Sequence, residues 1–174
     1  AMNLTILPES SADYDVIDHI LLDAFKYDEE VRLVRKLRSS SLFDPELSLV
    51  AISGDLCVGY TLYTPVTVYG DETRFVKIAG LGPVAVRSDF QRHGIGTAMI
   101  EFGLNLCRAK SFSAVAVLGY PAYYPHSGFL PASHWGLKLN FPAPAAAQMV
   151  LELEPKSLDD MQGPDHYLPE FDNV

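Results

Sequence analysis

The chain opens with a short alternation of apolar and polar residues and then changes to helical spacing. Residues 3–7 alternate as in a strand, and the apolar side chains that follow keep the spacing of one helix face at Val16, Ile20, Leu21 and Ala24. Between them, Ser10 is followed three residues later by Asp13, which resembles a capping box with Asp in place of Glu. The pattern predicts a strand followed by a helix.

A second amphipathic segment comes next and ends before Pro45. Val31, Val34 and Leu37 keep helical spacing on its apolar face. We expect its basic residues to face outward; these are Arg32, Arg35, Lys36 and Arg38.

Three strand-like runs follow, rich in Val, Thr and Tyr and separated by turns that contain Gly-Asp. They lie at residues 47–53, 57–68 and 75–86. Gly80, Gly82 and Pro83 interrupt the third run, and a proline cannot donate a hydrogen bond to a neighbouring strand. We therefore expect the third strand to be bulged or to lie on an opening edge.

The second half of the chain begins with a helical period. Ile95, Met99, Phe102 and Leu106 step by four, three and four, which predicts a helix over 94–110. Residues 114–118 are wholly apolar, as in a strand at the centre of a sheet. The segment 120–127 is too rich in proline for a long helix, and two alternating runs predict final strands at 135–139 and 149–153. This order of elements predicts a mixed sheet with helices on both faces.

Composition narrows the class of protein. The 174 residues suit one domain, which we place at 2–155, followed by an acidic, proline-containing tail at 156–174. The net charge of −9 argues against a surface for nucleic acid or anionic membrane, since both need a positive footprint. Cys57 and Cys107 stand among apolar residues and are expected to be reduced core residues of a cytoplasmic protein. No stretch reaches the ~20 apolar residues of a membrane span.

The candidate chemistry lies where the third strand gives way to the helix. A polar loop containing Arg92 and His93 is followed by Gly94 and Gly96, and a helix then begins. Unpaired amides at a helix start attract anions, and glycines let the backbone approach a phosphate closely. The dinucleotide-binding fingerprint is excluded because Met99 stands at its third glycine position, and no Gly-Lys-Ser/Thr of a Walker loop follows. On these residues alone, an ordinary tight turn between strand and helix is an equal alternative.

A family resemblance adds to this reading. Gln91-x-x-Gly94-x-Gly96 after the strand residues Val84-Ala85-Val86 resembles the Q/R-x-x-G-x-G/A motif of the GNAT family of N-acetyltransferases. The resemblance implies an α/β (α+β) fold with a mixed, mostly antiparallel sheet of about six to seven strands, splayed between strands 4 and 5. It also implies that acetyl-coenzyme A lies in that gap. Pantetheine would form hydrogen bonds with the backbone of Val84 and Val86, and the loop amides would bind the pyrophosphate. The implied cofactor residues are Val84, Ala85, Val86, Gln91, Arg92, His93, Gly94, Ile95, Gly96 and Thr97.

A second mark is a tyrosine four residues before a Gly-Phe pair. Tyr124, Gly128 and Phe129 match the Tyr-x-x-x-Gly-Phe common in this family, which implies that Tyr124 protonates the departing thiolate of coenzyme A. A purely packing role is the alternative. The segment before this tyrosine is shorter than in most members, and in this the chain resembles the bacterial YhbS-like branch of the family.

The general base is less well marked. No acid occurs between Phe75 and Val86, where many members place a Glu. The candidates for base or substrate contact are Asp28, Glu29, Glu30, Glu72 and His126. Acids at a helix start are also ordinary partners of the helix dipole, so a structural role stays open for the first three.

These observations predict an acetyl-coenzyme A-dependent N-acetyltransferase that transfers the acetyl group to a primary amine by direct attack on the thioester. A non-catalytic acyl-coenzyme A-binding sensor and a nucleotide binder of another α/β class are the alternatives. The acceptor is expected to be a small-molecule or peptide amine. No metal site is expected, because the histidines and cysteines show no ligand spacing. Family members often dimerise, which makes a homodimer a further expectation.

Overall fold

The computed structural model describes residues 3–70, 74–118, 128–137, 148–159, 161 and 165–166. Their contacts divide the chain into two compact units. The first holds the described residues up to Thr64 together with those from Gly82 to Leu104, and the second holds the rest. Strands β3 (Leu56–Tyr69) and β4 (Phe75–Val86) contribute residues to both units. The strand order is β1-β2-β3-β4-β5-β7-β6, and β8 pairs with β3.

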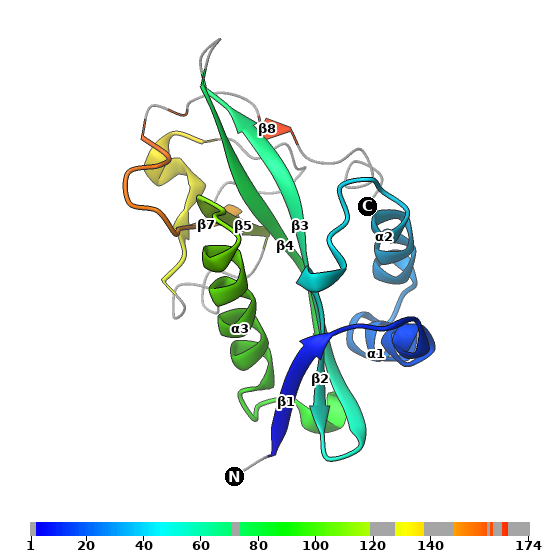
Figure 1. The fold of residues 1–174 in the computed structure, drawn as a ribbon. Helices are drawn as coiled ribbons and strands as arrows, with labels where there is room; N and C mark the ends of the chain where they lie inside the picture. The colour runs from blue at the N-terminus through cyan, green and yellow to red at the C-terminus, as the bar shows by residue number, and fades with distance from the viewer. Residues whose placement is uncertain are drawn as a thin grey trace. The chain divides into compact units, whose positions relative to one another are not determined.

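An antiparallel meander forms the sheet of the first unit (Figure 1). Strand β1 (Leu4–Pro8) pairs with β2 (Ser48–Ser53), with Ile6 opposite Ala51. Strand β2 in turn pairs with β3, and the register shifts between Ala51 and Ile52. The three strands agree with the predicted runs. Only β1 alternates in exposure, whereas β2 and most of β3 are buried on both faces, as in a sheet covered on both sides.

Helices α1 (Tyr14–Phe25) and α2 (Glu29–Arg38) lie on one face of this meander, and α3 (Ile95–Ala109) begins on the other (Figure 1). The predicted capping box is confirmed: the Ser10 N–H donates to Asp13 Oδ2 at 2.8 Å, at the 3-10 turn Ser11–Asp13 that leads into α1. A second 3-10 turn, Pro45–Leu47, leads into β2. The apolar face predicted for α2 is the buried one. In α1 the predicted Ile20 and Leu21 are buried together with Ile17, whereas Val16 and Ala24 are only partly buried.

The prediction that the basic residues of α2 face outward is wrong for one of them, Arg38. The Arg38 side chain is only 11% exposed, and its guanidinium donates to both carboxylate oxygens of Glu9 at 3.0 and 2.8 Å. It also lies over the Tyr14 ring, 3.9 Å from the centroid. A basic residue at the end of an amphipathic helix normally reaches solvent, but here a partner 29 positions earlier in the chain draws it inward. The pair joins β1, α1 and α2.

Helix α3 packs closely on β3 within the first unit. The Tyr63 hydroxyl donates to the Ile100 carbonyl at 2.7 Å, and the Tyr63 ring occupies the space beside Gly103. Ile95 and Met99 are buried as the period predicts, whereas Phe102 is 37% exposed. The buried face of the helix also includes Ile100 and Gly103. At 3.6 residues per turn, Phe102 lies at the edge of that face and not at its centre.

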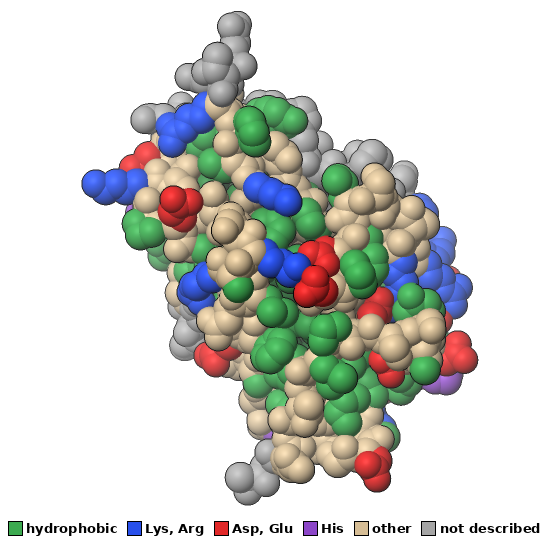
Figure 2. All heavy atoms as spheres, in the orientation of Figure 1, with side chains coloured by type: hydrophobic (Ala, Val, Ile, Leu, Met, Phe, Trp, Pro, Cys, Tyr) green, Lys and Arg blue, Asp and Glu red, His purple; other side chains and the backbone are tan. Residues whose placement is uncertain are grey.

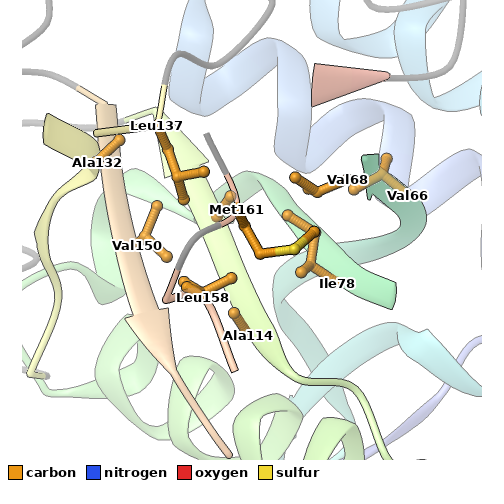
Figure 3. Close-up of a cluster of buried hydrophobic side chains, with 10 residues drawn as sticks. Val66, Val68, Ile78, Ala114, Ala132, Leu137, Val150, Leu158 and Met161 are labelled. Carbon is orange, nitrogen blue, oxygen red and sulfur yellow. The ribbon is translucent and has the colours of Figure 1, made fainter. Parts of the chain in front are cut away.

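The second unit contains the one parallel strand pair among the described pairings. Strand β4 runs parallel to β5 (Ala114–Leu118), which pairs antiparallel with β7 (Gln148–Glu152). Strand β6 (Leu130–Pro131) extends the sheet beside β7, and β8 (Asp165–His166) pairs with β3. Figure 3 shows the core of this unit, where Leu158 and Met161 lie among valines and isoleucine from the sheet.

The strand predicted at 135–139 is contradicted where the structure describes it. Residues Ala132–Trp135 form a 3-10 helix, and Gly136 closes it with φ of 71°. Its N–H donates to the Ser133 carbonyl at 3.0 Å. Trp135 and Leu137 alternate in the sequence because they lie on either side of Gly136, not because they belong to a strand. The left-handed conformation of Gly136 is incompatible with a regular strand at this position. Residues 138–140 lie outside the described part.

Two expectations from composition can be compared with the structure. Cys57 and Cys107 are both buried thiols, as predicted. Within the described ranges, no helix has the length and apolar character needed to cross a bilayer. On the face shown in Figure 2, basic and acidic side chains are interspersed.

Candidate functional site

Strand β4 contains one residue more than the stretch of β3 that it lies against. The Arg87 N–H donates to the Val58 carbonyl at 2.8 Å, and the Gly70 N–H donates to the Arg74 carbonyl at 2.9 Å. Between these two bonds β3 advances twelve positions and β4 thirteen. The extra residue is a β-bulge, and Gly82, with φ of 152°, lies in this interval. The bulge predicted from Gly80, Gly82 and Pro83 is therefore confirmed.

The last residues of β4 present main-chain groups on the side away from β3. The Val86 carbonyl shares a planar trans peptide with the Arg87 N–H, so the two groups point in opposite directions. Because the Arg87 N–H bonds to β3, the Val86 carbonyl points away from it. Alternation along the strand directs the Val84 groups the same way. The ladder to β5 ends at Leu81 opposite Val117, so β4 continues past it as an edge among the described pairings.

The side chains of this strand end hold it in place. Val84 and Val86 pack against the buried cluster of Ala51, Val58, Ile95 and Met99, while Ala85 is 2% exposed. The open edge therefore offers backbone groups on a strand whose side chains are fixed by packing.

A compact loop connects this edge to α3. It contains the 3-10 turn Ser88–Phe90, closed by the Phe90 N–H donating to the Arg87 carbonyl at 2.8 Å. The Arg87 guanidinium pairs with Asp89 at 2.9 Å. The Gln91 Nε2 donates to the Val86 carbonyl at 3.0 Å, which folds the loop back onto the strand. The sequence motif implies cofactor contact for Gln91, whereas in the structure its amide holds the strand end; the carbonyl keeps a second lone pair.

The loop ends in a row of amides at the start of α3. The Ala98 N–H is the first to bond to a helical carbonyl, that of Gly94, at 3.0 Å. The amides of Ile95, Gly96 and Thr97 precede it and have no carbonyl one turn earlier within the helix. They point toward the side where the helix dipole is positive. Such a row of amides can hold an anion, and we call it the amide cradle below.

Backbone conformation explains the glycine at 94. Gly94 has φ of 79°, and Arg92 has φ of 65°. A Cβ placed on Gly94 would meet no atom within 4 Å, so the glycine is not required by protein packing. Arg92 and His93 are exposed, and the His93 Nδ1 lies 3.2 Å from the Phe90 carbonyl. The exposed Arg92 and His93 side chains directly precede these amides in the chain and carry donors that suit phosphate.

A long-range contact that the sequence did not reveal anchors the beginning of the loop. Asp23 of α1 accepts from the Ser88 N–H at 2.6 Å and from the Ser88 hydroxyl at 3.0 Å. These hydrogen bonds, chiefly the one from the Ser88 amide, lower the pKa of Asp23. The only local signal was an acid in the last turn of a helix, where the dipole disfavours it.

The predicted acceptor-side acids lie around the start of α2. Asp28 is its N-cap residue and pairs with Arg32 at 3.3 Å, both side chains being about two thirds exposed. Glu29 is exposed, while partial burial raises the pKa of Glu30. These acids are on the face of the meander that carries α1 and α2, whereas α3 begins on the other (Figure 1). Tyr124, His126 and Glu72 lie outside the described residues.

Within the part of the chain that the structure describes, no group of three or more His, Cys, Asp and Glu side chains could hold a metal ion.

Comparisons with known proteins agree with this geometry. A family model for the acetyltransferase (GNAT) domain matches residues 6–132. The chain is 30% identical over 169 residues to the uncharacterized N-acetyltransferase YhbS of Escherichia coli K12, covering 97% of this chain and 98% of that protein. It is 33% identical over 135 residues to the uncharacterized N-acetyltransferase YjhQ of the same strain, covering 76% and 74%.

Solved structures are similar over almost the whole chain. The crystal structure of E. coli YhbS in complex with coenzyme A matches with a TM-score of 0.89 and 29% identity, covering 99% of this chain and 93% of that one. A GNAT family acetyltransferase from Brucella melitensis, in complex with acetyl-coenzyme A, matches with a TM-score of 0.77 and 27% identity, covering 98% and 99%. The similarity therefore extends over the open mixed sheet and the helices that flank it.

Proposed function

Because the chain belongs to the GNAT family of acetyltransferases, we propose that it transfers an acetyl group from acetyl-coenzyme A to a primary amine. The observation that carries the proposal is the edge of β4 beyond Leu81, followed directly by the amide cradle at the start of α3. A pantetheine arm needs exposed backbone donors and acceptors, and a pyrophosphate needs convergent N–H groups. The chain offers both in sequence, in the order in which coenzyme A would use them.

Each part of the cradle has a proposed task. The main chain of Val84, Ala85 and Val86 positions the pantetheine arm, and Gln91 keeps the Val86 carbonyl oriented. The amides from Arg92 to Thr97 receive the pyrophosphate. The side chains of Arg92 and His93 are exposed beside those amides and add donors to the phosphate oxygens. These contacts would hold the thioester in one orientation, which lowers the entropy cost of the reaction.

In the transfer, the carbon–sulfur bond of the thioester is broken and a carbon–nitrogen bond to the amine is formed. Acetyl-coenzyme A supplies an activated acyl group, which the neutral amine attacks at the thioester carbonyl. In the proposal Tyr124 protonates the departing sulfur, since a phenol is a donor at neutral pH. The acids near the start of α2 are the candidates for removing the proton from the amine; among them, partial burial raises the pKa of Glu30, which makes its carboxylate more basic. His126 and Glu29 remain candidates for contact with the acceptor.

The proposal extends to the setting of the reaction. The acceptor would be a small-molecule or peptide amine rather than a nucleic acid or a membrane lipid, in keeping with the net charge of −9. The buried thiols are compatible with a reducing cytoplasm. A homodimer is part of the proposal as well.

Isothermal titration with acetyl-coenzyme A tests the cofactor site. We expect micromolar binding by the wild type and at least a hundredfold loss in Gly94→Glu, because the carboxylate would enter the phosphate cradle. Gly54→Glu is the matched control: Gly54 also has positive φ, at 61°, and also has no atom within 4 Å of an added Cβ. Equal losses in both variants, or no binding by the wild type, would contradict the proposed site.

Turnover separates an enzyme from a non-catalytic acyl-coenzyme A sensor. We would screen amines by following release of coenzyme A with a thiol reagent, using the wild type and Tyr124→Phe. An enzyme should lose most of its turnover in Tyr124→Phe while keeping its affinity for acetyl-coenzyme A. Binding without turnover on every class of amine would favour the sensor, for which the absence of an acid between Phe75 and Val86 is the supporting observation.

A further inference from the structure

Asp23 is a carboxylate in an unfavourable local position. It lies in the last turn of α1, a helix with no basic residue in that turn. Helix carbonyls at this end carry partial negative charge, so an acid is disfavoured there. Its placement therefore calls for a partner outside the helix, and that partner is Ser88, 65 positions later in the chain.

The contact uses both oxygens of the carboxylate. Asp23 Oδ2 accepts from the Ser88 N–H at 2.6 Å, and Oδ1 lies 3.0 Å from the Ser88 hydroxyl, which donates to it. Ser88 is the first residue of the 3-10 turn Ser88–Phe90, whose N-cap is Arg87. Arg87 makes no side-chain cap bond. Asp23 therefore supplies from a different helix the cap that the turn lacks locally.

The rest of the loop is braced from within. The Arg87 guanidinium is held by Asp89, the Gln91 amide by the Val86 carbonyl, and the Phe90 N–H by the Arg87 carbonyl. Each of these bonds joins residues no more than five positions apart. They shape the loop but do not tie it to the first helix. The bond to Asp23 does so at the residue where the loop begins.

We propose that Asp23 is a positioning residue for coenzyme A: by fixing Ser88 to α1 it sets the orientation of the loop whose amides receive the pyrophosphate. The inference rests on the proposed function for its ligand. The geometry of the loop itself does not depend on that ligand. Misplacement of Ser88 would shift the short loop that leads to Gly94, because the bonds among residues 86–91 hold that part of the loop together as one unit.

Two variants and a control test the proposal. Asp23→Ala removes both bonds, and we expect it to raise the Kd for acetyl-coenzyme A roughly tenfold. Asp23→Asn keeps an oxygen that accepts from the Ser88 N–H and an NH2 that donates to the hydroxyl, so its Kd should stay within about threefold of wild type. The control is Asp18→Ala, which removes another α1 acid that reaches across to a neighbouring element, Arg35 of α2, at 2.6 Å.

Titration calorimetry and amide hydrogen exchange give the deciding readouts. Without ligand, Asp23→Ala should exchange faster than wild type at residues 88–94 but not in the middle of α3, and Asp18→Ala should leave residues 88–94 unchanged. Where an amine acceptor is available, KM for acetyl-coenzyme A should rise with little change in kcat. A loss of stability alone would affect both alanine variants and would not single out the loop.

The outcomes separate this inference from the proposed function. If the wild type binds acetyl-coenzyme A and the two alanine variants have the same Kd, the positioning role is overturned while the function stands. If Asp23→Asn is as weak as Asp23→Ala, charge and not position is what matters, and the proposal fails. If the wild type does not bind, the proposed function fails, and the exchange data alone decide whether Asp23 orders the loop.

Discussion

Two regions of the molecule, the start of α3 and its middle, contain glycine for different reasons. At Gly94, before the first turn, the backbone has φ of 79° and an added Cβ would meet nothing within 4 Å. At Gly103, two turns into the helix, an added Cβ would overlap the ring of Tyr63. The first glycine is explained by its backbone conformation and lies in open space, and the second makes room for a protein side chain. Glycine therefore has a conformational role just before α3 and a packing role in its middle.

The difference between Gly94 and Gly103 implies that substitutions in the middle of α3 should change stability, whereas substitutions just before its start should change ligand affinity. Around Tyr63 and Gly103 the atoms are packed, so substitutions should act on the free energy of unfolding. Around Gly94 the atoms are open, so substitutions should act on the Kd for acetyl-coenzyme A. The four predictions below test that separation, from the largest expected effect to the smallest.

Gly103→Ala should lower the free energy of unfolding by about 3 kcal/mol, because the methyl group overpacks against a buried ring. Urea unfolding followed by circular dichroism measures this loss. At a temperature where the variant is folded, its Kd for acetyl-coenzyme A should match that of wild type. A loss below about 1 kcal/mol would mean that the Tyr63 ring has room to move, and the comparison would break at this end.

Gly94→Ala should lower the free energy of unfolding by about 1.5 kcal/mol, since a residue with a Cβ is strained at positive φ. Gly54→Ala, at φ of 61°, is the control and should lose a similar amount. The two variants should differ in ligand binding: we expect a roughly tenfold rise in Kd for Gly94→Ala and none for Gly54→Ala. Calorimetry showing equal affinity in both would leave Gly94 with a conformational role only.

Tyr63→Phe should lower the free energy of unfolding by about 1 kcal/mol, the usual net value of one buried hydrogen bond. The bond lost is the 2.7 Å contact between the Tyr63 hydroxyl and the Ile100 carbonyl. The ring remains, so packing beside Gly103 is preserved. Thermal unfolding in parallel with titration calorimetry checks this prediction, and a change in acetyl-coenzyme A affinity would show that the packed region influences the cradle.

Mild acid should have the smallest effect. The hydrogen bonds from Ser88 lower the pKa of Asp23 below its usual range, so the carboxylate is ionised in the native state throughout mild acid. A depressed native pKa contributes stability above the unfolded value of about 4 and loses it only as pH falls further. Amide exchange at Ser88, corrected for its intrinsic pH dependence, should give the same protection at pH 5 and pH 8. A loss of protection at pH 5 would contradict this.

Local patterns predicted most of the elements to within a residue or two. The runs at 75–86 and 114–118 coincide with β4 and β5, because turn residues and side-chain period mark strand ends over short stretches. The prediction failed at 135–139, where Gly136 ends a 3-10 helix. Alternation over three residues does not distinguish a turn from a strand when a left-handed glycine stands between them.

The candidate site divides in the same way. The row of amides at the start of α3 was predictable, because it is made of consecutive main-chain groups next to glycines that the sequence displays directly. Its binding of phosphate stays a prediction. The direction of the Val84 and Val86 main-chain groups, away from β3, could not be derived from the residue pattern. It depends on which strand accepts a hydrogen bond from the Arg87 N–H. The sequence also did not reveal the bond from the Gln91 side-chain amide to the Val86 carbonyl, and the predicted cofactor contact of Gln91 stays a prediction.

By itself, the sequence determined the order of strands and helices up to β5, the bulge in β4 and the family motif, because each depends on residues close together in the chain. The tertiary structure alone decided that Arg38 turns inward to Glu9 and that Asp23 holds Ser88. These partners are separated by 29 and 65 positions. In the sequence Arg38 looks like an ordinary surface charge, and the position of Asp23 at the end of a helix does not indicate which residue is its partner. Such pairs form only when the fold brings distant segments together, since no local preference favours them.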